Sequence, residues 1–169
     1  MVIIKKSKVL NLPHILKVYI KMIKVFIDDE RNPNDVFWFQ SVKKDQVSAW
    51  LSNDKFEQII VIRNFFDFVK WIKEHKTKLD WNNVIFSFDH DLQDWHPQTN
   101  KEDSLIVQYG IHYPYGEHPD KIELTGASCL RYLLDNLQQV NINNIDLHTK
   151  NPIAINNMKN IVNQYGVLE

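Results

Sequence analysis

Two apolar segments, each ending in a cluster of acidic residues, constrain this chain more than any other feature. Residues 23–27 are apolar apart from one lysine and run directly into Asp28, Asp29 and Glu30. Residues 84–88 repeat the design and are followed by Asp89, His90 and Asp91. Short apolar runs of this kind are typical of buried strands, so each acidic cluster is expected at a strand end. Two strands of one sheet would then bring carboxylates together around a single divalent cation.

The composition is that of one globular domain and excludes several functional classes. The chain has 169 residues, 44% of them hydrophobic and 24% charged, which is enough to bury a substantial core. A formal net charge of −1 argues against a surface that coats nucleic acid, although a local basic site stays open. Only four glycines occur, and none forms a dinucleotide-binding or P-loop pattern. The single cysteine, Cys129, excludes an intramolecular disulfide and suits the reducing cytoplasm, where we expect the protein to reside.

The first 21 residues form a basic extension with a character of their own. They contain five lysines and no acidic residue, and lysines and Pro13 interrupt their apolar residues. This pattern does not fit a secretory signal, and no apolar stretch reaches the length of about 18 residues needed to span a membrane. We therefore predict no membrane partner. The extension is expected to add a strand or tail ahead of the fold, and a basic surface-binding helix is the alternative.

Downstream, strand-like runs alternate with amphipathic helices. Strands are predicted at residues 23–27, 59–62, 84–88 and 145–148, and a short helix at 44–52. Further helices should start after Asn64, Thr125 and Asn151, the last followed by a proline at the first helical position. This order predicts a three-layer α/β fold whose mostly parallel sheet has about four core strands and helices on both faces. A long insertion, residues 93–121, follows the third strand, and a short strand is expected within it at 105–109.

The strand-end acids are the candidate metal ligands. In open parallel sheets ligands gather beyond the carboxyl ends of the strands. Asp28, Asp29 and Asp89 are all expected there, and their oxygens suit Mg²⁺ or Mn²⁺. The alternative for any one of these acids is turn formation or helix capping.

Two histidines and two arginines are candidates for phosphate chemistry. His90, beside Asp91, and His148 could move protons or hold phosphate, and the alternative is a half-buried histidine bonded to a neighbouring carboxylate. Arg31 and Arg63 follow strand ends, where a guanidinium could grip a phosphate, or could instead form an ion pair with a nearby acid.

Several short motifs resemble, in order, the cyclic-phosphate-processing receiver-like domain family. They are Ile-Asp-Asp-Glu-Arg-Asn-Pro ending at Pro33, Val-Ile-Arg ending at Arg63, Ser-Phe-Asp-His-Asp-Leu ending at Leu92, Thr-Gly at Thr125, and His-x-x-Asn-Pro starting at His148. The resemblance implies a receiver-like, flavodoxin-like domain over residues 22–169 and a role in processing cyclic phosphates, either of nucleotides or of RNA ends. The chain departs from the pattern where Gln93 and Asp94 replace the usual glycine, where Ala127 and Ser128 replace a common Tyr-Asp pair, and where Ile155 replaces arginine.

Together these observations give a leading hypothesis and two alternatives. The leading hypothesis is a metal-assisted phosphoesterase in which Asp28, Asp29 and Asp89 hold Mg²⁺ or Mn²⁺. His90, His148 and Asp91 would then serve catalysis, while phosphate contacts come from Arg31, Arg63, Thr125 and Asn151. The expected partner is a small nucleotide or an RNA end. The alternatives are a signalling receiver phosphorylated on Asp89, and a non-catalytic module that binds a cyclic nucleotide beneath a lid containing Trp95.

Overall fold

The computed structural model describes residues 22–34, 36, 40–41, 56–97, 104–112 and 121–166. The predicted basic extension and the predicted helix at 44–52 lie outside these residues. Among the described residues, no helix combines the length and the hydropathy that a membrane crossing requires.

A five-stranded sheet with the order β2-β8-β4-β1-β3 forms the centre of the molecule. Four of its strands are parallel: β1 (Met22–Ile27), β3 (Phe56–Ile62), β4 (Val84–Phe88) and β8 (Ile145–Leu147). The short β2 (Gln40–Ser41) pairs antiparallel with β8 at the edge. The prediction of a mostly parallel sheet with four core strands is confirmed. One-turn 3₁₀ helices, η2 (Trp81–Asn83) and η3 (Ile142–Asn144), lead into β4 and β8.

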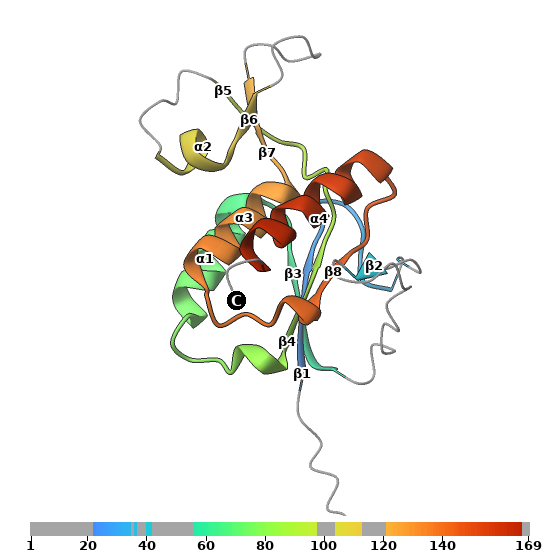
Figure 1. Cartoon of the computed structure of the whole chain (residues 1–169), viewed down its shortest axis with the longest axis vertical. Coiled ribbons are helices and arrows are strands. Elements are labelled where there is room, and N and C mark those ends of the chain that lie inside the picture. Colours follow the sequence, from blue (N-terminus) through green and yellow to red (C-terminus); the bar gives the residue numbers. More distant parts are fainter. Residues whose placement is uncertain are drawn as a thin grey trace, which may run out of the picture.

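Three helices, α1 (Phe65–His75), α3 (Gly126–Asn136) and α4 (Pro152–Gly166), lie side by side on one face of this sheet (Figure 1). Helices are predicted on both faces, whereas these three, the long helices of the described residues, all cover the same face. Their apolar residues meet the alternate strand positions that face them, and the resulting core includes Val25, Ile27, Phe86, Phe88, Phe68, Leu130, Leu133 and Met158. All three predicted caps are present. The side chains of Asn64, Thr125 and Asn151 each accept a hydrogen bond from a backbone N–H in the first turn of their helix.

The opposite face of the sheet carries several buried polar side chains beside the apolar Phe26. It carries Lys24, Ser87 and Asp146 at the alternate positions, all less than a tenth exposed. Burial lowers the pKa of Lys24 to about 8, although the negative charge of Asp146 opposes that shift. This face leads along the strands toward their carboxyl ends, where the acidic clusters lie.

The insertion folds into a small antiparallel sheet with the order β5-β7-β6, which stands beyond the carboxyl ends of the core strands (Figure 1). Its elements are β5 (Asp94–Pro97), α2 (Ser104–Tyr109), β6 (Ile111–His112) and β7 (Lys121–Leu124). The strand predicted at 105–109 is wrong, because this segment is the helix α2. Ile106 and Tyr109 share its buried side, and the Ser128 hydroxyl donates to the Tyr109 carbonyl at 2.7 Å, so contacts with α3 select the helix.

Candidate functional site

The site lies where the parallel strands end. The hydrogen bonding between parallel strands continues for one residue past the end of each strand. Asp28 N–H donates to the Ile62 carbonyl at 3.1 Å, and Asp89 N–H donates to the Ile27 carbonyl at 2.9 Å. His148 N–H likewise donates to the Phe88 carbonyl at 2.9 Å. Because adjacent strands lie about 4.8 Å apart, this shared register sets Asp28, Asp89 and His148 in one row across β1, β4 and β8.

Three carboxylates converge at this row. Asp28, Asp29 and Asp89 each offer an oxygen, and these oxygens all lie within 4.8 Å of one another. Asp28 and Asp89 are buried, and Asp29 is half-buried. The acid cluster (Asp28, Asp29 and Asp89) therefore has the spacing that a single cation needs, and the sequence grouped the same three residues.

Asp28 is the most heavily bonded member of the acid cluster. Its Oδ1 accepts hydrogen bonds from the backbone N–H groups of Glu30 at 3.0 Å and Arg31 at 2.6 Å. Its Oδ2 accepts from Arg31 Nε at 2.7 Å and pairs with His148 Nε2 at 3.1 Å. Burial opposes ionisation of Asp28, but these hydrogen bonds and the charge of Arg31 outweigh it and lower the pKa of the carboxyl.

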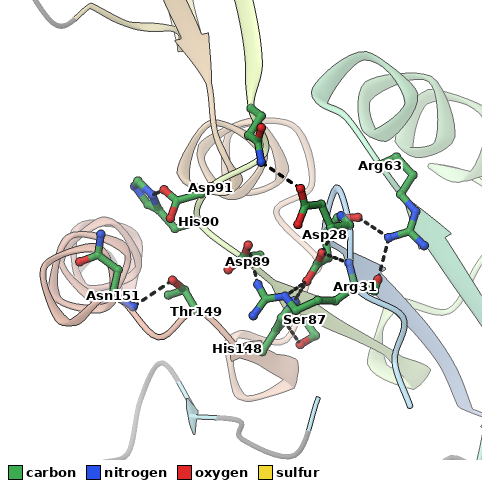
Figure 2. Close-up of polar contacts among 12 residues, drawn as sticks. Asp28, Arg31, Arg63, Ser87, Asp89, His90, Asp91, His148, Thr149 and Asn151 are labelled. Carbon is green, nitrogen blue, oxygen red and sulfur yellow. Dashed lines mark hydrogen bonds and ion pairs between the residues drawn. The ribbon is translucent and has the colours of Figure 1, made fainter. Parts of the chain in front are cut away.

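Arg31 places a positive charge inside the acid cluster. Its Nε binds Asp28 and its Nη2 lies 2.6 Å from Asp89 Oδ2, so one guanidinium bridges the two buried acids (Figure 2). The side chain is 28% exposed, which leaves it a route to solvent. Arg63 serves a different purpose, since its Nη1 donates to the backbone carbonyls of Asp28 at 2.8 Å and Arg31 at 2.6 Å. Arg63 thus stabilises the backbone of the loop after β1 and does not point toward the acid cluster.

The other two acids of the cluster are harder to ionise than Asp28. Burial raises the pKa of Asp89 despite its hydrogen bond and ion pair with Arg31. Burial also raises the pKa of Asp29, and the negative charges of Asp28, Glu30 and Asp89 add to that shift. Two carboxyls with raised pKa beside a third that is firmly ionised form a site where added positive charge is favourable.

His148 lies behind the acid cluster. It is 0% exposed and stacks on Phe26 with ring centroids 4.3 Å apart, and burial lowers its pKa even though Asp28 favours the charged form. The neutral ring must donate from Nε2 to the ionised Asp28, so Nδ1 accepts from the Ser87 hydroxyl at 2.7 Å. The order Ser-His-Asp is that of a hydrolytic triad, but Ser87 is 0% exposed and cannot reach a substrate. The hydrogen bonds from Ser87 through His148 therefore orient the Asp28 carboxylate.

His90 points away from Asp28, toward the N-terminal end of α4 (Figure 2). Its Nδ1 lies 2.6 Å from Oδ1 of the exposed Asp91, and this is the ring's one hydrogen bond within the described residues. His90 also lines a cleft of about 730 Å³ between α3, α4 and β6. Of the two predicted histidines, His90 is thus the one that borders open space.

Thr125 and Asn151 act mainly as caps. Thr125 is fully buried and forms a reciprocal capping box with Ser128 at the start of α3. Asn151 is exposed, accepts from Ile153 and Ala154 N–H through Oδ1, and also lines the cleft. Of these two predicted phosphate contacts, Asn151 alone borders space that a ligand could enter.

Comparison with known proteins assigns the chain to a family. The family model of the cyclic-phosphate processing receiver domain matches residues 23–164. The chain belongs to this family. No curated protein and no solved structure shows significant similarity to it. Family membership and the parallel sheet together confirm the predicted receiver-like, flavodoxin-like fold.

The Thr-Gly motif of this receiver domain has a steric role that the sequence alone did not show. A Cβ on Gly126 would lie 1.6 Å from the Asp89 carbonyl oxygen, and Gly126 N–H donates to the His90 carbonyl at 2.7 Å. Only glycine lets α3 approach so closely, and the contact fixes the backbone that carries Asp89 and His90.

Gln93 is a departure from the receiver family with a structural consequence. It stands where the family resemblance expects glycine, and its φ of 49° is the one positive value among the described residues other than glycine. Its side chain reaches back to Glu30, with Nε2 donating to Oε1 at 3.3 Å. A strained residue thus connects the loop after β4 to the loop after β1.

Glu123 on β7 is a further member of the site that sequence reasoning missed. It is only 7% exposed, and burial raises its pKa, with added repulsion from Asp91 and Asp29. The available signal was an acid flanked by Ile122 and Leu124 in a strand-like run. Through Glu123, the small sheet β5-β7-β6 adds a buried acid whose pKa responds to the charges of Asp91 and Asp29.

Proposed function

We propose that this receiver domain is a metal-assisted phosphoesterase that opens a cyclic phosphate, on a nucleotide or at an RNA end. The observation that carries the proposal is the convergence of the Asp28, Asp29 and Asp89 oxygens within 4.8 Å of one another. Membership of a cyclic-phosphate processing family supports the substrate class.

The donor set fits Mg²⁺ or Mn²⁺, because hard divalent cations take carboxylate oxygens and complete their shell with water and phosphate. Asp29 and Asp89 would be the principal ligands, since Asp28 already accepts four hydrogen bonds. When bound, the ion would polarise the phosphoryl group and favour ionisation of a water. Arg31 would have to release Asp89 for this carboxylate to hold the ion, because the guanidinium now occupies it.

The chain's own residues divide the remaining tasks. Arg31, freed from Asp89, is placed to bind the phosphate oxygens, with which a guanidinium makes paired hydrogen bonds. A water oxygen forms the new bond to phosphorus as the ring P–O bond breaks, and the water's proton leaves to solvent. His90 gives its Nε2 proton to the departing oxygen and regains one from solvent, while Asp91 holds Nδ1 and orients the ring.

His148 receives a positioning role in place of the direct proton transfer that the sequence suggested. It has no exposure, and both ring nitrogens are engaged by Ser87 and Asp28. It fixes the orientation of Asp28, which in turn holds Arg31.

The test is to incubate the full chain with 2′,3′-cyclic nucleotides, 3′,5′-cyclic nucleotides and RNA ending in a 2′,3′-cyclic phosphate, each with Mg²⁺, Mn²⁺ or EDTA. We expect metal-dependent ring opening that Asp29→Asn abolishes. Glu30→Gln is the matched control, because Glu30 is an exposed neighbouring acid outside the acid cluster.

Other outcomes would redirect the assignment. Inactivity toward all these substrates with either metal would refute the phosphoesterase proposal. An aspartyl phosphate on Asp89 after acetyl phosphate treatment, detected by mass spectrometry, would favour a signalling receiver. Tight binding with the cyclic nucleotide recovered unchanged would favour a sequestering module.

A further inference from the structure

The cleft beside His90 has walls unlike the acid cluster next to it. It runs between α3, α4 and β6, and its volume of about 730 Å³ lies within the range of roughly 300–1,000 Å³ common for small-molecule sites. His90 lines it and directly follows Asp89 in the chain, so the cleft starts one residue from the acid cluster. His90 therefore joins the wall of the cleft to the strand end that carries Asp89.

The α4 wall of the cleft is a stripe of amide side chains. Asn157, Asn160 and Gln164 are spaced i, i+3 and i+7, so they share one face of the helix, and all three are exposed and line the cleft. Two further asparagines of α4, Asn156 and Asn163, are also exposed but do not line the cleft. An amide carries both a donor and an acceptor, which is the combination that pairs with the edge of a nucleobase.

The other walls suit the flat faces of a base. The apolar Ala127 and Ala154 lie in the lining, while Arg131 from α3 and His112 from β6 provide planar polar groups. Base faces pack well on apolar surfaces, aromatic rings and guanidinium planes. Neither Arg131 nor His112 belongs to the acid cluster, so this part of the lining is separate from the carboxylates.

We propose that this cleft holds the nucleoside of the substrate, with the base against the amide stripe and the ribose over His90. The inference rests on the proposed function, because it is the acid cluster that would hold the attached cyclic phosphate. It adds that the substrate is recognised through its base, so a cyclic phosphate without a base would be handled poorly. The nucleoside could belong to a mononucleotide or to the last residue of an RNA.

A titration with unphosphorylated nucleosides tests the cleft independently of any phosphoesterase activity. The full chain, labelled with ¹⁵N, is titrated with adenosine, guanosine, cytidine and uridine while side-chain amide signals are followed by NMR. We expect at least one nucleoside to shift the signals of Asn157, Asn160 and Gln164 and to leave those of Asn156 and Asn163 in place. Absence of shifts with all four, or equal shifts in both groups, would overturn the proposal even if ring opening were observed.

A variant pair on the same helix gives the second test. Asn157→Ala combined with Asn160→Ala should weaken binding of the preferred 2′,3′-cyclic nucleotide roughly tenfold, measured by calorimetry, because amide-to-base contacts are lost. Asn156→Ala combined with Asn163→Ala is the matched control and should bind as the parent does. Equal affinity of the two double variants would refute the assignment. Repeating the titration with a short RNA bearing the same end separates the two sources: tighter binding of the RNA indicates an RNA end, and equal or weaker binding indicates a mononucleotide.

Discussion

Replacing Asp28 should destabilise the fold far more than replacing its neighbour Asp29, although both acids belong to one cluster. Asp28→Ala removes an acceptor of four hydrogen bonds from a site with no solvent exposure. It removes the Asp28 acceptor of the buried His148 Nε2–H and one of the two carboxylates that Arg31 bridges. Breaking a buried charged network from one side costs about 3–5 kcal/mol.

Partial exposure of Arg31 lets that side chain rehydrate, so we expect a loss of about 3–4 kcal/mol in the free energy of unfolding. At about 2–4 °C per kcal/mol for a chain of this size, the melting temperature should fall by roughly 6–16 °C. Asp29 has a raised pKa because burial and neighbouring anions disfavour its charge. Asp29→Ala removes that unfavourable charge at neutral pH, so stability should stay within about 0.5 kcal/mol of the parent or increase.

Urea and thermal unfolding, both in EDTA so that no metal contributes, would measure the two variants side by side. We expect a large loss of stability for Asp28→Ala and none for Asp29→Ala. Similar losses for both, or a neutral Asp28→Ala, would show that the hydrogen bonds to Asp28 do not organise the loop.

Three more predictions concern the backbone and the response to pH. Gly126→Ala should destabilise the fold by more than about 2 kcal/mol in urea unfolding, because the new methyl meets the Asp89 carbonyl; an unchanged midpoint would contradict the close approach. Gln93→Gly should raise the free energy of unfolding by up to about 1 kcal/mol, because removing the strain of the left-handed backbone outweighs the larger conformational entropy that glycine loses on folding. A clear loss of stability would show that the contact of Gln93 with Glu30 matters more. Folding lowers the pKa of His148 from 6.5, so below about pH 6.5 the unfolded state binds a proton that the folded state does not, and stability should fall. Urea unfolding midpoints measured from about pH 7.5 to about pH 5.5 test this prediction. An equal decline in the His148→Asn variant would contradict it.

The sequence predicted the elements whose causes are local. Runs such as residues 84–88 are apolar enough to be buried wherever the chain places them, and Asn64, Thr125 and Asn151 carry the oxygens that cap a helix start. The grouping of the strand-end acids followed as well, because parallel strands present their carboxyl ends at the same edge of a sheet.

Features decided by tertiary contacts could not be predicted in the same way. The α2 segment has six residues, too few for a periodic pattern, and its helix depends on packing against α3. Arg31 and His148 were recognised as polar residues at strand ends, but no pattern shows that one bridges Asp28 and Asp89 while the other turns inward beneath Asp28. Glu123 enters the site only because the insertion folds back over the strand ends.

Titration of Mn²⁺, followed by the electron paramagnetic resonance of the free ion, tests the central claim most directly. We expect one bound ion per chain, tighter binding in Arg31→Ala because the competing guanidinium is gone, and loss of binding in Asp29→Asn. Failure of both the parent and Arg31→Ala to bind one ion, or undiminished binding in Asp29→Asn, would contradict a cation site formed by these carboxylates.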